Sequence, residues 1–219
     1  EELSAAGSAV FDVLLATSVQ NDHPEKTPRP FDANRDGLVV GEGAGCLILE
    51  EYEHAQARGA TIYAEIIGYG SNTDGQHVTR PDSEMMGRCM QLALKDAQLT
   101  AADIDYVNAH GTSTDQGDIA ESQATVRILG QKPISSLKSY FGHTLGACGA
   151  IEAWLSIEMM QRNQFVPTLN LDNIDPACAE LDYICGDIRP MSAKIIMTNN
   201  FAFGGINTSL IFKNNIDHN

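Results

Sequence analysis

DIDYVNAHGTSTDQGD (residues 103–118) passes from an apolar run into small hydroxyl residues, and one histidine, His110, stands at the junction. The apolar part is typical of a buried strand, and the glycine directly after His110 allows the chain to turn sharply. Ligands of open α/β sheets bind beside the carboxyl ends of the strands. His110 therefore lies where a ligand site is expected, although a histidine before a turn can also be purely structural.

Strands and helices alternate on both sides of this segment. The expected helices cover 1–18, 51–59, 83–99, 119–129 and 151–162, and the expected strands cover 37–51, 62–70, 103–110 and 132–139. Two further β runs within 193–213, joined by a turn at Gly204 and Gly205, are typical of a hairpin. This order predicts one α/β unit with a mixed β-sheet and helices on both faces.

The charge balance excludes some partners. Of the 219 residues, 14 are Lys or Arg and 29 are Asp or Glu, so the formal net charge is −15. Nucleic acids and anionic membrane surfaces attract clustered positive charge, and we expect neither as a partner. No apolar run approaches the roughly 20 residues that a membrane span needs, and no signal-peptide pattern opens the sequence. These features favour a cytoplasmic location.

A second histidine lies in KSYFGHTLGACGAIEA (residues 138–153). His143 precedes a helix, whose dipole and unpaired amides are expected to keep the imidazole neutral. Lys138 ends the preceding expected strand, and Glu152 can pair with it only if the loop folds back; otherwise both are ordinary surface residues. Two histidines at element ends, with a lysine and hydroxyls nearby, favour a site that stabilises an oxyanion or enolate.

Other kinds of site find less support. The distance in sequence from His110 to His143 matches no compact metal-binding motif, and we predict no metal. GEGAG (residues 41–45) lacks the Lys-Ser/Thr of a phosphate-binding loop, so close backbone packing is the expected role of its glycines. Phe201 and Phe203 are expected either in the core or as walls of a pocket for an apolar substrate.

Taken together, the motifs resemble one family. RPFDANRDGLVVGEGAG, NAHGTSTDQGD, KSYFGHTLGACGAIEA and NNFAFGGIN occur in this order, and residues 1–213 resemble the β-ketoacyl-acyl-carrier-protein synthases of the thiolase-like superfamily, most closely the elongating type. The resemblance implies an acyltransferase that performs decarboxylative Claisen condensation in fatty acid, polyketide or polyene synthesis. It implies acyl carrier protein as partner, a homodimer or a ketosynthase heterodimer, and no cofactor besides the carrier's phosphopantetheine.

The resemblance also implies roles for the catalytic residues. His110 and His143 would hydrogen-bond the malonyl thioester oxygen and stabilise the enolate formed by decarboxylation. Lys138 matches the family's supporting active-site lysine, and Glu152 matches the carboxylate near it.

Four further residues match substrate-binding positions of the family. Thr112 and Thr114 match threonines that hydrogen-bond the phosphopantetheine arm, Phe203 matches the gating phenylalanine beside the acyl pocket, and Phe201 is its neighbour. The loop with Asp74 and His77 resembles the mobile loop that accompanies this gate.

The nucleophilic cysteine of the family belongs upstream of Glu1, and none of Cys46, Cys89, Cys148, Cys178 and Cys185 matches it. Cys148, in a glycine-rich helix start, is the only tempting substitute. We therefore expect a C-terminal portion of a layered αβαβα fold whose N-terminal half is missing, with no condensing activity alone. The expected divisions are 1–60, the tail of the N-terminal half and the crossover; 61–213, the C-terminal half; and 214–219, a tail.

Two alternatives stay open at this stage. A chain-length-determining partner subunit would lack the nucleophile and be non-catalytic, but such subunits commonly lose other catalytic residues, whereas His110, Lys138 and His143 are all present. A thiolase acting on coenzyme A thioesters would carry a second cysteine in its late glycine-rich turn, where this sequence reads FAFGGIN.

Overall fold

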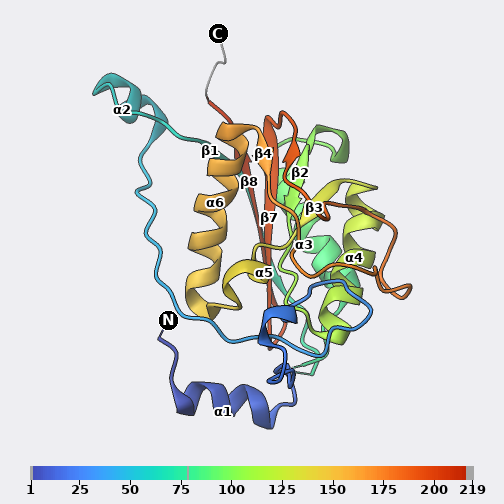
Figure 1. Cartoon of the computed structure of the whole chain (residues 1–219). Coiled ribbons are helices and arrows are strands. Elements are labelled where there is room, and N and C mark those ends of the chain that lie inside the picture. Colours follow the sequence, from blue (N-terminus) through green and yellow to red (C-terminus); the bar gives the residue numbers. More distant parts are fainter. Residues whose placement is uncertain (1, 78, 216–219) are drawn as a thin grey trace.

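A computed structural model describes residues 2–77 and 79–215, and Figure 1 shows their arrangement around one main sheet. The helices are α1 (Ala5–Val13), α2 (Tyr52–Ala57), α3 (Ser83–Asp96), α4 (Asp115–Leu129), α5 (Lys138–Phe141) and α6 (Cys148–Arg162), with 3-10 turns at Pro24–Lys26, Ala101–Asp103 and Leu145–Ala147. The strands are β1 (Glu65–Thr73), β2 (Tyr106–Asn108), β3 (Pro133–Ser135), β4 (Gln164–Phe165), β5 (Asp182–Tyr183), β6 (Arg189–Pro190), β7 (Ile195–Ala202) and β8 (Ile206–Lys213).

The main sheet is mixed, as expected. Its six strands run in the order β1-β8-β7-β2-β3-β5, and the remaining described strands, β4 and β6, pair with each other. β1, β8 and β7 are antiparallel, whereas β7, β2, β3 and β5 are parallel. β7 and β8 form the predicted hairpin, with Ala202 opposite Ile206. Within the described residues, no helix is long and apolar enough to cross a bilayer.

Helices cover both faces of the sheet, so the predicted fold class is confirmed (Figure 1). Neighbouring residues of one strand point to opposite faces because side chains alternate along a strand. Val107 and Met197 belong to the apolar core under α3 and α4, while Tyr106 and Ile196 belong to the core under α6. The central strands are thus buried on both sides, and their carboxyl ends open on the site described below.

The strand expected over 37–51 does not form. Only Leu38 and Val40 make isolated bridges, and Ile48 remains 86% exposed. A strand needs a regular partner strand for its backbone groups, and among the described residues none pairs with 41–51 in a strand ladder. Gly41, Gly43 and Gly45 instead pack closely against 141–151. The extended part that remains positions His143: the His143 backbone nitrogen donates to the Val39 oxygen, and the Gly41 nitrogen donates to the His143 oxygen. α1 is also shorter than expected and buries no residue.

The strand expected over 132–139 is shorter than predicted. β3 ends at Ser135, and Lys138 begins the short helix α5 instead of ending a strand. The Ser136 carbonyl accepts a hydrogen bond from the Ser139 hydroxyl, which supports this turn, and Gly142 ends it with φ +74°. The turn redirects Lys138 toward the interior, where it is 1% exposed.

Close packing of α3 on β1 depends on a glycine. A Cβ built on Gly70 would stand 2.2 Å from the Cys89 carbonyl oxygen and 2.7 Å from the Ala93 nitrogen. Both atoms are backbone and cannot move aside without shifting α3. Gly149 in α6 offers a matched contrast, because its Cβ would meet nothing closer than 3.6 Å.

We predict that Gly70→Ala lowers the free energy of unfolding by about 1–3 kcal/mol through overpacking. Gly149→Ala should leave it unchanged or raise it by up to about 1 kcal/mol, since alanine favours a helix. Urea denaturation followed by circular dichroism measures both. Equal effects of the two substitutions would show that helix packing on β1 tolerates a side chain.

Candidate active site

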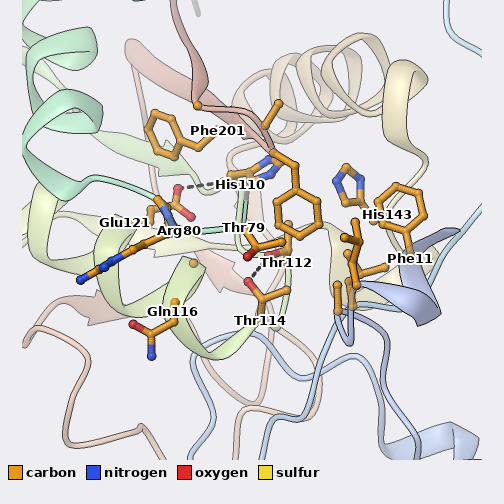
Figure 2. A pocket seen from close by; sticks show the side chains of 18 of the residues that line it. Phe11, Thr79, Arg80, His110, Thr112, Thr114, Gln116, Glu121, His143 and Phe201 are labelled. Carbon is orange, nitrogen blue, oxygen red and sulfur yellow. Dashed lines mark hydrogen bonds between the residues drawn. The ribbon is translucent and has the colours of Figure 1, made fainter. Parts of the chain in front are cut away.

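A cavity of about 520 Å³ opens where β2, the β2–α4 loop, the α5–α6 connection and the β7–β8 turn meet (Figure 2). Most residues predicted for the site line it: His110, Thr112, Thr114, His143, Phe201 and Phe203. Phe11 of α1, Cys148 and Asn200 also face the cavity. The fold therefore brings both histidine motifs and the aromatic turn to one place.

His110 has a defined tautomer. Its ring is buried, and Nδ1 lies 3.2 Å from Nζ of Lys138. An ammonium group can only donate, so Nδ1 accepts and the proton of the neutral ring sits on Nε2. Burial, followed by the positive charge of Lys138, lowers the pKa of His110 well below its usual value. His110 is thus a neutral hydrogen-bond donor through Nε2.

His143 has the same tautomer for a different reason. Its Nδ1 accepts a hydrogen bond from the Leu145 backbone nitrogen at 3.1 Å, which leaves the proton on Nε2. Its pKa is lowered to about 3, mainly by burial and secondly by Lys138. The sequence predicted a neutral ring from the dipole and unpaired amides of a helix start. The Leu145 amide, which begins the 3-10 turn before α6, does bond Nδ1, while burial is the first cause of the lowered pKa. The ring centroids of His110 and His143 are 5.3 Å apart.

Lys138 and Glu152 form a buried ion pair. Nζ lies 2.5 Å from Oε1, and the side chains are 1% and 0% exposed. The chain does fold back between them, so the alternative of two surface residues is wrong. Burial raises the pKa of Glu152, and Lys138 acts in the opposite direction. One ammonium group thus joins the carboxylate to the His110 ring.

Thr112 and Thr114 present adjacent hydroxyls to the cavity. Their Oγ1 atoms are 2.9 Å apart, and Ser113 between them adopts φ +68°. Gly117, in the first turn of α4, packs against this pair, since a Cβ there would stand 2.4 Å from Oγ1 of Thr114. The loop is therefore tightly fitted to α4.

The two phenylalanines take different places. Phe201 is buried, with its ring centroid 6.3 Å from that of His110. Phe203 lies at the β7–β8 turn, and its ring centroid is 6.2 Å from that of Phe11. Asp74 contacts this turn through a backbone hydrogen bond from its nitrogen to the Gly205 oxygen, 3.0 Å. The loop with Asp74 and His77 thus lies against the turn that carries Phe203, although Val78 lies outside the described residues.

Glu121 is a site residue that the sequence analysis missed. Its two carboxylate oxygens accept hydrogen bonds from the backbone nitrogens of His110 (2.8 Å) and Gly111 (2.7 Å). Burial raises its pKa to about 7, against the effect of these two bonds. One signal was available: Glu121 is three residues before Ala124, on the face of α4 that is buried. Glu121 holds the backbone that carries His110.

A second network, also missed, holds the loop from its other side. Asp118 accepts hydrogen bonds from the Phe31 and Ser113 nitrogens, and burial raises its pKa to about 6. The Arg35 guanidinium lies 3.5 Å from Asp118 and donates to the Thr114 carbonyl. The RPFDANRDG motif therefore anchors the threonine loop.

Cys148 does not have the properties of a nucleophile. Its thiol donates a hydrogen bond to Oδ1 of Asn200 at 3.0 Å, and burial raises its pKa. Reactive cysteines need a lowered pKa, because the thiolate is the nucleophile. Cys148 is therefore a protonated thiol in the cavity wall.

The arrangement suits stabilisation of negative charge on oxygen. Two neutral imidazoles border one cavity, and each has Nδ1 occupied by a fixed donor, so each ring carries its proton on Nε2. Such N–H donors stabilise an oxyanion without reorganising during the reaction. The Asn200 side chain, which also lines the cavity, hydrogen-bonds the His110 ring. Within residues 2–77 and 79–215, no group of three or more His, Cys, Asp or Glu could hold a metal ion.

Fold and cavity together define an α/β protein whose cavity, between strand ends, is bordered by two neutral imidazoles. Comparison of the sequence with protein families gives a more specific result: the beta-ketoacyl synthase C-terminal domain matches residues 63–172, and the beta-ketoacyl synthase N-terminal domain matches residues 2–55. The chain belongs to the β-ketoacyl synthase family. The boundary expected at residue 60 stays a prediction, and residues 216–219 of the expected tail lie outside the described residues.

Known relatives agree with this assignment. The 3-oxoacyl-[acyl-carrier-protein] synthase 2 of Rhizobium meliloti (strain 1021) is 49% identical over 99% of the chain and 52% of its own length. A crystal structure of a beta-ketoacyl synthase from Burkholderia phymatum STM815 shares 68% identity with a TM-score of 0.97, over 98% of this chain and 53% of that one.

A further similar structure is a type II PKS acyl-carrier protein in complex with its ketosynthase bound to the hexaketide. It has a TM-score of 0.92 and 38% identity, over 99% of this chain and 54% of that chain. The chain thus spans about half the length of the curated relatives it matches.

The buried histidines predict a specific pH dependence. A ring whose folded pKa lies below its unfolded value near 6.5 binds fewer protons when folded, so folding stability falls as pH falls below 6.5. For His143, with a folded pKa of about 3, this loss amounts to about 2 kcal/mol between pH 7 and pH 5. His143→Gln should remove this contribution, whereas His23→Gln, at an exposed position, should not. Urea denaturation at both pH values measures it, and parallel losses in wild type and His143→Gln would contradict a neutral buried ring.

The Lys138–Glu152 pair predicts a large effect of breaking it. Glu152→Ala leaves a buried ammonium group without its partner, and we expect the free energy of unfolding to fall by about 3–5 kcal/mol. Glu158→Ala on the same helix removes an exposed pair with Arg162 and should cost about 0.5 kcal/mol or less. The double variant Lys138→Met with Glu152→Ala should be more stable than Glu152→Ala alone in denaturation experiments. If it is not, the unpaired charge is not the cause of the loss.

Proposed function

We propose that this chain forms the malonyl-binding part of a β-ketoacyl-acyl-carrier-protein synthase. The whole enzyme would extend an acyl thioester by decarboxylative Claisen condensation, in fatty acid or related polyketide or polyene synthesis. The observation that carries the proposal is the pair of neutral imidazoles, His110 and His143, which border one cavity and both carry their proton on Nε2.

The geometry supports the following steps. The malonyl thioester carbonyl oxygen accepts hydrogen bonds from Nε2 of both histidines. The bond between the malonyl Cα and its carboxylate breaks, carbon dioxide leaves, and the electron pair forms an enolate whose oxygen carries the negative charge. The two donors stabilise that charge most strongly at this point, which lowers the barrier. The enolate carbon then attacks the acyl carbonyl, and the thiolate that carried the acyl group leaves.

In that last step the acyl group is borne by the family's nucleophilic cysteine, which the family resemblance assigns upstream of Glu1. The protonated thiol of Cys148 is not a substitute. Burial, followed by the positive charge of Lys138, keeps both imidazoles neutral, and Glu152 compensates the charge of Lys138.

The cavity walls support a carrier-borne substrate. Thr112 and Thr114 offer hydroxyls to the amides of a phosphopantetheine arm, and Phe201, Phe203 and Phe11 offer apolar surface to an acyl chain. The ketosynthase that was solved with its acyl-carrier protein supports such a carrier as partner here. We further propose a homodimer or a ketosynthase heterodimer, in the cytoplasm, without another cofactor.

A non-catalytic chain-length factor is the second candidate, since the chain also resembles the ishigamide ketosynthase/chain length factor (35% identity, TM-score 0.91). The His110 ring bonded to the Lys138–Glu152 pair and the His143 ring oriented by the Leu145 amide favour the catalytic subunit, because a subunit without chemistry has no need of two oriented donors.

The test measures decarboxylation of malonyl-carrier protein by a polypeptide of full family length that contains residues 1–219. We expect His110→Ala and His143→Ala each to lower kcat by about 100-fold or more, the usual effect of removing one oxyanion donor. Exposed His54→Ala is the matched control and should retain the wild-type rate. Near-wild-type rates in both active-site variants would refute the proposal. The 219-residue chain alone should show no condensation.

A further inference from the structure

Polar groups along one wall of the cavity follow an order from inside to outside. His110 and Thr112 are buried, at 7% and 8% exposure, Thr114 is half-buried, and Gln116 and Arg80 are exposed. All five line the cavity. This wall therefore leads from the imidazoles to solvent past the two hydroxyls, and it ends at a guanidinium group.

Figure 2 shows Arg80 and Gln116 on the side of the cavity away from Phe11 and His143. Phe11 and the neighbouring Leu14 and Leu15 form an apolar wall on that other side. The cavity thus has a polar route to solvent and an apolar wall opposite it. A substrate with a long polar arm and an apolar end would place the arm on the Arg80 side.

The charge of Arg80 is available to a ligand. Among the described residues, Arg80 is the only Lys or Arg that lines this cavity, and it takes part in no ion pair there. The nearby acids are engaged: Asp115 lies 3.4 Å from Arg35 and accepts from Gln116 Nε2 at 2.7 Å, and Glu121 holds two backbone amides. In a chain with net charge −15, a cation without a partner at the cavity rim is notable.

The base of the Arg80 side chain is fixed. Its backbone nitrogen donates to the His77 oxygen at 2.9 Å, and Pro81 restricts the backbone that follows. Asp82 then caps α3 by accepting from the Glu84 nitrogen at 2.8 Å. The Cα of Arg80 is therefore held in place, and its guanidinium group lies at the outer end of the polar wall.

We propose that Arg80, with Gln116 beside it, binds the phosphate of the substrate's phosphopantetheine arm. This inference rests on the proposed function and deepens it. Outward from the thioester, such an arm carries the thioester carbonyl, two amides and then a phosphate. The wall offers imidazole N–H donors, hydroxyls and a guanidinium group in the same order. Arginine binds phosphate through charge-assisted, often bidentate hydrogen bonds.

The experiment compares three probes with the 219-residue chain by isothermal titration calorimetry. They are decanoyl-pantetheine, which lacks the phosphate, decanoyl-phosphopantetheine, and decanoyl-coenzyme A. We expect the phosphate to tighten binding to the wild type about 5- to 10-fold at low salt, and less at high salt because the site is exposed. In Arg80→Gln this gain should fall below twofold, with binding of decanoyl-pantetheine unchanged. Arg88→Gln, an exposed arginine of α3 outside the cavity, should behave as the wild type.

The outcomes separate this proposal from the proposed function. A full phosphate gain in Arg80→Gln overturns the role of Arg80 while leaving the proposed function intact. Failure of decanoyl-pantetheine itself to bind the wild type counts against the substrate class. Equal affinities of the phosphopantetheine and coenzyme A esters support recognition of the arm's own phosphate. Tighter binding of the coenzyme A ester that Arg80→Gln abolishes would show instead that Arg80 contacts the nucleotide.

Discussion

The site depends on one buried positive charge. The ammonium group of Lys138 is 1% exposed, and a charge in that position is tolerated only because Glu152 pairs with it at 2.5 Å. The same group donates to Nδ1 of His110 and disfavours a second positive charge on either imidazole. The tautomer of His110 therefore follows from this ion pair between α5 and α6. His143 takes its tautomer from the Leu145 amide, and both rings are kept neutral first by burial and then by the charge of Lys138.

Local patterns in the sequence were sufficient for the central part of the fold. The apolar run before His110 and the glycine after it predicted β2 and the turn, the helix expected over 119–129 is the larger part of α4, and the Gly204–Gly205 turn predicted the β7–β8 hairpin. The turn, the helix and the hairpin form through contacts close in sequence, whereas β2 also takes β3 and β7 as partners. The expected strand over 37–51 failed for the opposite reason, since a strand exists only where a partner supplies hydrogen bonds.

The site was predictable in its members but not in its connections. The sequence motifs contained His110, His143, Lys138 and Glu152. The pairing of Lys138 with Glu152, however, depends on the short helix α5, and the pattern of 132–139 predicted a strand there instead. Glu121 was missed because its partners are backbone amides, and every non-proline residue has one, so no residue type in the sequence indicates the contact. The neutral state of His143 was expected from a helix dipole and its unpaired amides; the Leu145 amide does bond the ring, but burial is the first cause of its lowered pKa.

The two hydrogen bonds that Glu121 accepts from the main chain have a consequence for how substitutions can alter this site. Because Glu121 already binds the amides of His110 and Gly111, these amides are not available to a ligand, and the oxyanion donors proposed here are side chains. A site built from main-chain amides is altered only by reshaping the backbone. Here each donor is a separate side chain on a fixed frame, so a single codon change can replace one donor while the other keeps its geometry. The frame and the chemistry can therefore evolve independently.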